Sequence, residues 1–213
     1  MKTHILFDLD GTITDSIEGI TNSIQYSLKS FGMIEKDPQS LRRFLGPPLK
    51  QSFMKFYGFS ESKADQAVAK YREYFQTKGI YENKVYPGIP QLLESLSNKT
   101  IVLATAKPQV FAQKILGHFA LTPYFSFVGG CTLDGKRTTK SEVISYVLSK
   151  NHISPDCAIM VGDREDDVIG ARNNHVDSIG VLYGYGGEEE LVSAGATYLA
   201  KDIAALLDLL RSC

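Results

Sequence analysis

The feature that constrains this chain most is a repeated pairing of a short apolar run with a polar or glycine-bearing turn and then a segment of helical spacing. Five runs have this form, at residues 3–7, 101–104, 125–128, 158–161 and 178–182. Buried parallel strands are nearly continuous in apolar residues, and helices are the usual connections between them. The pattern predicts an α/β fold, a Rossmann-like parallel sheet covered by helices on both faces.

The alternation stops between residues 16 and 83, where the chain has the pattern of amphipathic helices instead. One helical face carries Ile17, Ile20, Ile24 and Leu28, and a second helical stretch runs from about residue 60 to 78. A turn at residues 86–88, Tyr-Pro-Gly, marks the return to the main domain. We therefore expect a catalytic core at residues 1–15 and 84–213, with a small all-helical cap at residues 16–83 inserted after the first strand.

Composition excludes several classes of function. The 213 residues are 43% hydrophobic and 22% charged, which is typical of a globular chain, and the formal net charge is −1. No block of basic residues is dense enough to follow a phosphate backbone, so nucleic acid is not the expected partner. No apolar stretch suggests a membrane span or signal peptide, and the cytoplasm is the expected location. A monomer is the default expectation, with a dimer as the alternative.

Cysteine and histidine give no sign of a metal site. The three cysteines contain no CxxC pair, and the four histidines form no HxxxH or HExxH pair. Packing or chance explains the cysteines, and we assign no role to any of the histidines.

Carboxylates follow two of the predicted strands. Asp8 and Asp10 close the first strand two residues apart, on one face of it, although such residues can also cap a helix. Asp163 and Asp167 follow the strand at 158–161. Open parallel sheets bind ligands at the carboxyl ends of their strands, so the two acidic groups should converge. Clustered carboxylates repel one another, which favours a Mg²⁺ ion between them, although the helix dipole explains part of the second group.

Hydrogen-bond donors for an anion follow two other segments. Thr105-Ala106-Lys107 comes after the second strand of the main domain, and Lys140 precedes a helix. A phosphoryl group needs such partners for its oxygens. Alone, each is as well explained by a helix cap or a surface charge.

The ordered set of DLDGT, a strand-ending threonine, a later lysine and GDxxxD resembles the haloacid dehalogenase-like hydrolase superfamily across essentially the whole chain. The segments RRFLGPPL at residues 42–49 and GYG at 184–186 resemble its branch of phosphoglycolate phosphatases and related 5′-nucleotidases. These two segments could equally be a proline-punctuated helix connection and a glycine loop.

The resemblance implies a role for each motif residue. Asp8 would be the nucleophile and Asp10 the general acid and base. Mg²⁺ would be held by Asp8, the main-chain carbonyl of Asp10 and Asp163, with Asp167 contributing directly or through water.

Substrate contacts follow from the same resemblance. Thr105 and Lys140 would hold the phosphoryl group, and the backbone of Ala106 would replace the asparagine common at that position. Arg42 and Arg43, in the cap, are candidates for reading an anionic group of the substrate.

The expected activity is that of a magnesium-dependent phosphatase acting on a small phosphorylated metabolite, phosphoglycolate or a nucleoside 5′-monophosphate, through an aspartyl phosphate. Asp10 favours a phosphatase over a dehalogenase, since an alkoxide leaving group needs a proton and a halide does not. A sugar phosphomutase on the same fold and a non-catalytic metabolite-binding protein remain alternatives. A P-loop at residues 130–136 is a further alternative, although Arg137 stands where its hydroxyl residue belongs.

Overall fold

The computed structural model describes residues 2–213 and divides them into two compact units. One unit comprises the residues up to Asp15 together with Val85–Cys213, and the other is Ser16–Lys84. Two short strands, β2 (Thr14–Asp15) and β3 (Lys84–Val85), pair as a two-stranded sheet where the chain passes between the units. No helix in the described part of the chain has the length and apolarity to cross a membrane.

The first unit is built on a six-stranded sheet in the order β5-β4-β1-β6-β7-β8, and every pairing is parallel. The strands are β1 (His4–Phe7), β4 (Thr100–Pro108), β5 (Phe127–Cys131), β6 (Ala158–Gly162), β7 (Asp177–Val181) and β8 (Tyr198–Ala200). The α/β fold with a Rossmann-like parallel sheet, expected from the sequence, is confirmed. Strand β1 lies between β4 and β6, so the three carboxyl ends that matter below are neighbours.

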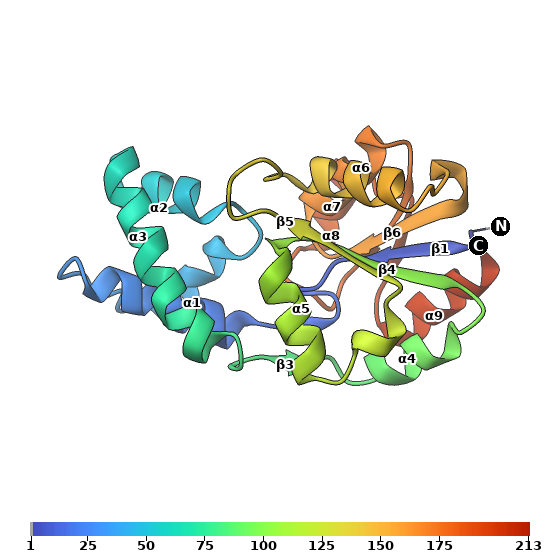
Figure 1. Ribbon diagram of the computed structural model, residues 1–213, viewed down its shortest axis with the longest axis horizontal. Helices are drawn as coiled ribbons and strands as arrows, with labels where there is room; N and C mark the ends of the chain where they lie inside the picture. Colours follow the sequence, from blue (N-terminus) through green and yellow to red (C-terminus); the bar gives the residue numbers. More distant parts are fainter. Residues whose placement is uncertain (1) are drawn as a thin grey trace. The chain divides into compact units, whose positions relative to one another are not determined.

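Helices cover both faces of this sheet, with α6 and α7 on one face and α4, α5 and α9 on the other (Figure 1). Val143 and Val147 of α6 pack with Leu6 of β1, Val102 of β4 and Met160 of β6, all of them buried. The helices of this unit are α4 (Ile89–Ser95), α5 (Gln109–His118), α6 (Lys140–Lys150), α7 (Glu165–Asn173), α8 (Glu188–Ala194) and α9 (Ile203–Ser212), with short turns η3 (Thr122–Tyr124) and η4 (Pro155–Cys157). The buried apolar surface fixes the strand ends against one another.

Element boundaries differ from the expectation in two informative places. Strand β4 continues to Pro108, so residues 105–107 belong to it rather than to a following turn. Strand β5 begins at Phe127 rather than Phe125, because Thr122–Tyr124 forms a 3₁₀ turn first. The apolar run alone did not reveal either limit, since polar residues at a strand end and apolar residues in a turn escape a hydrophobicity pattern.

The second unit is helical, as its periodicity predicts. It contains α1 (Ile17–Lys29), the 3₁₀ helix η1 (Pro38–Phe44), α2 (Leu49–Tyr57), α3 (Glu61–Tyr74) and η2 (Phe75–Gly79). Ile20, Ile24 and Leu28 of α1 are buried, as are Ala64 and Ala67 of α3. The helical stretch expected up to residue 78 changes to a π turn at η2.

Candidate active site

The site is assembled at the carboxyl ends of β1, β4 and β6. Asp8 follows β1 directly, Thr105 lies near the end of β4, and Asp163 follows β6. The register pairs Phe7 with Leu103 on one side and Val161 on the other, which brings these positions to one edge of the sheet. Neighbouring parallel strands thus place the polar groups together, although 155 positions of sequence separate the two aspartates.

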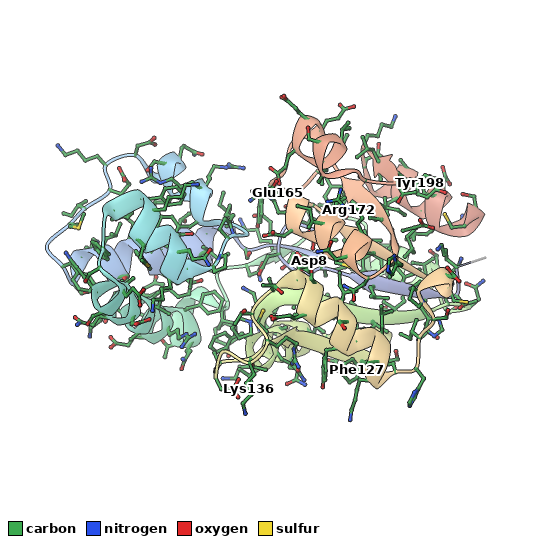
Figure 2. All side chains as sticks on the ribbon, turned by 90° about the horizontal axis from the view of Figure 1, so that it is seen from above. Asp8, Phe127, Lys136, Glu165, Arg172 and Tyr198 are labelled. Atoms are coloured by element: carbon green, nitrogen blue, oxygen red, sulfur yellow. The ribbon has the colours of Figure 1, made fainter. Side chains whose placement is uncertain are left out.

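Three carboxylates form a buried cluster at this edge. Asp8, Asp163 and Asp167 each offer an oxygen within 4.8 Å of the others, and they are 7%, 0% and 2% exposed. In Figure 2, Asp8 lies between α6 and α7, the two helices that cover one face of the sheet. The structure therefore brings together three of the four residues expected at a metal site.

Lys140 joins two members of the cluster. Its ammonium nitrogen lies 2.6 Å from Asp8 Oδ1 and 2.7 Å from Asp167 Oδ1, and it donates to the carbonyl oxygen of Ala104 at 3.1 Å. The residue is 6% exposed at the first position of α6. A capping box formed by Thr139 and Glu142 fixes the start of that helix, and with it the direction in which Lys140 enters the site.

Burial and mutual repulsion dominate the electrostatics. Burial raises the pKa of Asp163 well above its usual range, and the charges of Asp167 and Asp8 raise it further. Burial also raises the pKa of Asp167, against the lowering effect of Lys140. For Lys140, burial lowers the pKa, but the carboxylates of Asp167 and Asp8 outweigh it and the net direction is upward. Lys140 therefore remains a cation in this cluster.

The donor set fits a magnesium ion. The cluster contains three carboxylates, and its one ammonium group, Lys140, contacts two of them, so negative charge is in excess. Each ligand atom is an oxygen, the kind that Mg²⁺ prefers, and a divalent cation would offset the repulsion that raises the pKa of Asp163.

Asp163 is held from two further segments. Its Oδ1 accepts a hydrogen bond from the Thr12 hydroxyl at 3.3 Å, and its Oδ2 accepts one from the Tyr185 backbone N–H at 2.7 Å. Gly11 has φ +85°, and a side chain there would place a Cβ 2.5 Å from Asp163 Cγ. At Gly184 the space is also filled, since a Cβ there would meet the Asp163 side chain and the Gly11 carbonyl oxygen.

The loop at residues 184–186 thus packs against an aspartate of the cluster. Its sequence resembled one branch of the family, but nothing in the sequence indicated which residue it contacts. The Tyr185 hydroxyl also donates to Asp15 Oδ1 at 3.0 Å, which ties the loop to the segment that follows Asp10.

The side chain of Asp10 is not part of the cluster formed by Asp8, Asp163 and Asp167. Its Oδ2 is 2.8 Å from Lys107 Nζ, and its Oδ1 is buried with no hydrogen-bond partner among residues 2–213. The sequence expectation for the metal concerned only its main-chain carbonyl. In the sequence, Lys107 is only the last residue of Thr105-Ala106-Lys107, and nothing there indicates its pairing with Asp10.

Thr105 is 1% exposed, and its hydroxyl accepts a hydrogen bond from the Lys107 backbone N–H at 3.2 Å. Ala106 is partly buried and packs against the apolar cluster under α6. Thr105 and Ala106 thus lie toward the carboxyl end of β4, the strand next to β1, while their contacts with a substrate stay a prediction.

Arg42 and Arg43 belong to the helical unit and differ in their surroundings. The Arg43 guanidinium lies 4.5 Å from the ring centre of Phe56 and 5.4 Å from that of Tyr57, and Glu35 is 3.9 Å away. Arg42 is exposed, with a contact to Gln39 at 3.5 Å. Arg43 thus has a packing role within its own unit.

The P-loop alternative fails on geometry. Gly130 lies within β5, and α6 begins only at Lys140, so the segment does not run from a strand directly into a helix. Lys136 is on an exposed loop, away from Asp8, and pairs with Asp134 at 3.3 Å (Figure 2). Residues 130–136 therefore do not form a P-loop.

Known proteins with similar sequences agree with the motifs. Residues 5–181 match the family model described as haloacid dehalogenase-like hydrolase. A 5′-nucleotidase from Pseudomonas aeruginosa is 47% identical over 98% of this chain and 96% of its own length. Tyrosine-protein kinase PtkA of Mycobacterium tuberculosis is 32% identical over 97% of this chain and 70% of its own length. A phosphoglycolate phosphatase from Vibrio vulnificus is 26% identical over 96% of this chain and 94% of its own length.

A solved structure agrees over the full chain. The crystal structure of a predicted phosphatase from Clostridium acetobutylicum is 50% identical, covers 100% of both chains and superposes with a TM-score of 0.97.

Proposed function

The chain belongs to the haloacid dehalogenase-like hydrolase family, and from that premise we propose that it is a magnesium-dependent phosphomonoesterase acting through an aspartyl phosphate on Asp8. The observation that carries the proposal is the buried cluster of Asp8, Asp163 and Asp167 with Lys140 bonded to Asp8. That the chain is a phosphatase agrees with the family match and with the relatives named 5′-nucleotidase and phosphoglycolate phosphatase.

The chemistry begins at Asp8. A carboxylate is a weak nucleophile toward an anionic phosphate, so its position and the charge around it must be fixed in advance. Lys140 holds Asp8 Oδ1, and its positive charge would offset the negative charge of the phosphoryl oxygens. Thr105 and the backbone N–H of Ala106 would bind the remaining oxygens.

Asp163 and Asp167, with Asp8 and the main-chain carbonyl of Asp10, would hold Mg²⁺. When bound, the ion neutralises the charge that builds up on the transferring phosphoryl group. Asp167 Oδ1 already forms an ion pair with Lys140 at 2.7 Å, and Oδ2 accepts a hydrogen bond from the Arg164 backbone N–H at 3.1 Å, which favours a contact through water.

Proton transfer falls to Asp10. It would protonate the alkoxide oxygen as the phosphorus–oxygen bond breaks, and then accept a proton from the water that hydrolyses the aspartyl phosphate. One residue would serve as acid and base in turn.

The substrate class we propose is a small phosphomonoester, with phosphoglycolate and nucleoside 5′-monophosphates as the first candidates because relatives carry both names. The helical unit would act as the cap that reads the leaving group, with Arg42 as the candidate for an anionic substituent, since Arg43 is engaged by Phe56 and Tyr57.

The test is phosphate release from a panel of phosphomonoesters, with and without Mg²⁺, by the wild type and by Asp8→Asn. Metal-dependent release that Asp8→Asn abolishes supports the proposal. Formation of a stable isomer without free phosphate would favour a mutase, and phosphate found on a tyrosine peptide would favour a kinase-like acceptor. Binding without turnover across the panel would favour a non-catalytic protein.

A further inference from the structure

The second buried lysine of the core, Lys107, has no role in the account above. It is 9% exposed, and its ammonium group pairs with Asp10 Oδ2 at 2.8 Å. Lysine is almost never buried to this degree without a carboxylate partner, because removing an ammonium ion from water is costly. The carboxylate paired with Lys107 belongs to Asp10, the residue proposed as general acid and base.

The backbone is shaped to deliver Lys107 to that partner. The pairing of β4 with β5 shifts register between Thr105 and Pro108, an irregularity of the kind that re-aims a side chain. The Lys107 N–H bonds back to the Thr105 hydroxyl at 3.2 Å. A side chain at Gly130 would place a Cβ 2.6 Å from the Lys107 carbonyl oxygen, so glycine there is required for this path of the chain.

The two lysines of the site divide the carboxylates between them. Lys140 pairs with Asp8 and Asp167, both in the carboxylate cluster, whereas Lys107 pairs with Asp10, whose side chain lies outside that cluster. Asp8 and Asp10 are only two residues apart, and separate cations keep their carboxylates in separate positions. The ion pair with Lys107 thus holds the Asp10 side chain apart from the carboxylate cluster.

The two oxygens of Asp10 are not equivalent. Oδ2 is paired with Lys107, while Oδ1 is buried and receives no hydrogen bond from the described residues. A buried carboxylate oxygen without a donor is costly unless a ligand completes it.

We propose that Lys107 is a positioning residue for Asp10: by holding Oδ2 it leaves Oδ1 as the oxygen that exchanges the proton. The inference rests on the proposed function. In the first half of the reaction the Asp8–phosphorus bond forms, the bond from phosphorus to the leaving oxygen breaks, and the proton on Oδ1 passes to that oxygen. In the second half, water gives a proton to Oδ1 as its oxygen attacks phosphorus and Asp8 leaves. Lys107 stays an ammonium ion throughout.

The test compares substrates that differ in their need for a proton. Lys107→Met keeps the length of the side chain and removes the charge; Lys107→Arg restores it; Lys114→Met, on the exposed face of α5, is the matched control. The two probes are 4-nitrophenyl phosphate, whose leaving group needs no proton, and the better substrate among phosphoglycolate and adenosine 5′-monophosphate. The parameter is kcat/KM, which covers the steps up to loss of the leaving group.

We expect Lys107→Met to lower kcat/KM for the alkyl phosphate about 10- to 100-fold, the scale of a misplaced acid, and to leave the aryl phosphate within about threefold. Lys107→Arg recovers most of the loss, and Lys114→Met loses nothing. In an Asp10→Asn background, Lys107→Met should have no further effect on kcat/KM, because the proposed role of Lys107 is exerted through Asp10.

Three results would overturn the inference. Equal loss on both probes would indicate a structural role. A further loss in the Asp10→Asn background, or a rise in KM confined to phosphoglycolate, would indicate that Lys107 binds the substrate itself. Wild-type enzyme that is inactive, or activity that survives Asp8→Asn, would instead defeat the proposed function, so the two failures are distinguishable.

Discussion

Lys140→Met tests whether the carboxylate cluster is held together by one cation. Methionine fills most of the lysine stem, so the change removes charge with little cavity. The variant loses contacts of 2.6 Å to Asp8, 2.7 Å to Asp167 and 3.1 Å to the Ala104 carbonyl oxygen. Two buried carboxylates then lack their cation, a situation that costs about 3–5 kcal/mol. For a chain of this size that corresponds to a fall in Tm of about 6–20 °C.

The assay is thermal unfolding at pH 7.5 in chelator and then in excess Mg²⁺. The added cation should recover part of the loss, by about 2.7 kcal/mol when its concentration is 100 times its Kd. Lys136→Met is the control, since Lys136 pairs with Asp134 only on an exposed loop, and its Tm should not change. A loss below about 1 kcal/mol in Lys140→Met, or no response to Mg²⁺, would refute the reasoning that this cluster is short of positive charge.

Three further predictions follow from individual contacts. Gly184→Ala should destabilise the protein by about 1–3 kcal/mol and weaken Mg²⁺-dependent activity, because its Cβ would displace Asp163. Gly187 has open space around it, so Gly187→Ala should leave stability and activity unchanged. Equal Tm values for the two variants would contradict this prediction. Arg43→Ala should lower the free energy of unfolding by about 0.5–1 kcal/mol, because its aromatic contacts are lost. Arg42→Ala should raise KM for phosphoglycolate but not for 4-nitrophenyl phosphate. A loss of stability in Arg42→Ala, or a raised KM for phosphoglycolate in Arg43→Ala, would count against these two roles. Burial raises the pKa of Cys131 to about 11, so its thiolate fraction at pH 8 is about one thousandth and a thiol reagent should label it only after unfolding; rapid labelling that Cys131→Ser removes would disprove this.

The fold can be predicted from the sequence because each strand and helix is indicated by a short stretch of residues. Apolar runs followed by helical spacing predict a parallel sheet, and carboxylates placed directly after two runs predict that Asp8 and Asp163 meet at its edge. The structure confirms the sheet and places both aspartates there. The phosphatase assignment is confirmed by the family match and the relatives' names, while the roles of the individual site residues stay predictions.

The remaining parts of the site depend on geometry that the sequence does not carry. The pairing of Lys107 with Asp10 requires β4 to extend beyond its apolar run and to shift register beside Gly130. The hold of Tyr185 on Asp163 is a backbone hydrogen bond, which leaves no trace in residue type. Arg42 and Arg43 look alike in the sequence, and only the rings around Arg43 separate them.

The most direct test of the central claim is to look for the phosphoryl group on Asp8. With 4-nitrophenyl phosphate and Mg²⁺, the first step needs no acid but the second needs Asp10 as base, so Asp10→Asn should accumulate the intermediate. We expect a burst of one nitrophenol per enzyme, and an acid-quenched mass spectrum with one phosphoryl group added on the peptide that contains Asp8. No burst and no added mass in Asp10→Asn, together with turnover that persists in Asp8→Asn, would contradict the account.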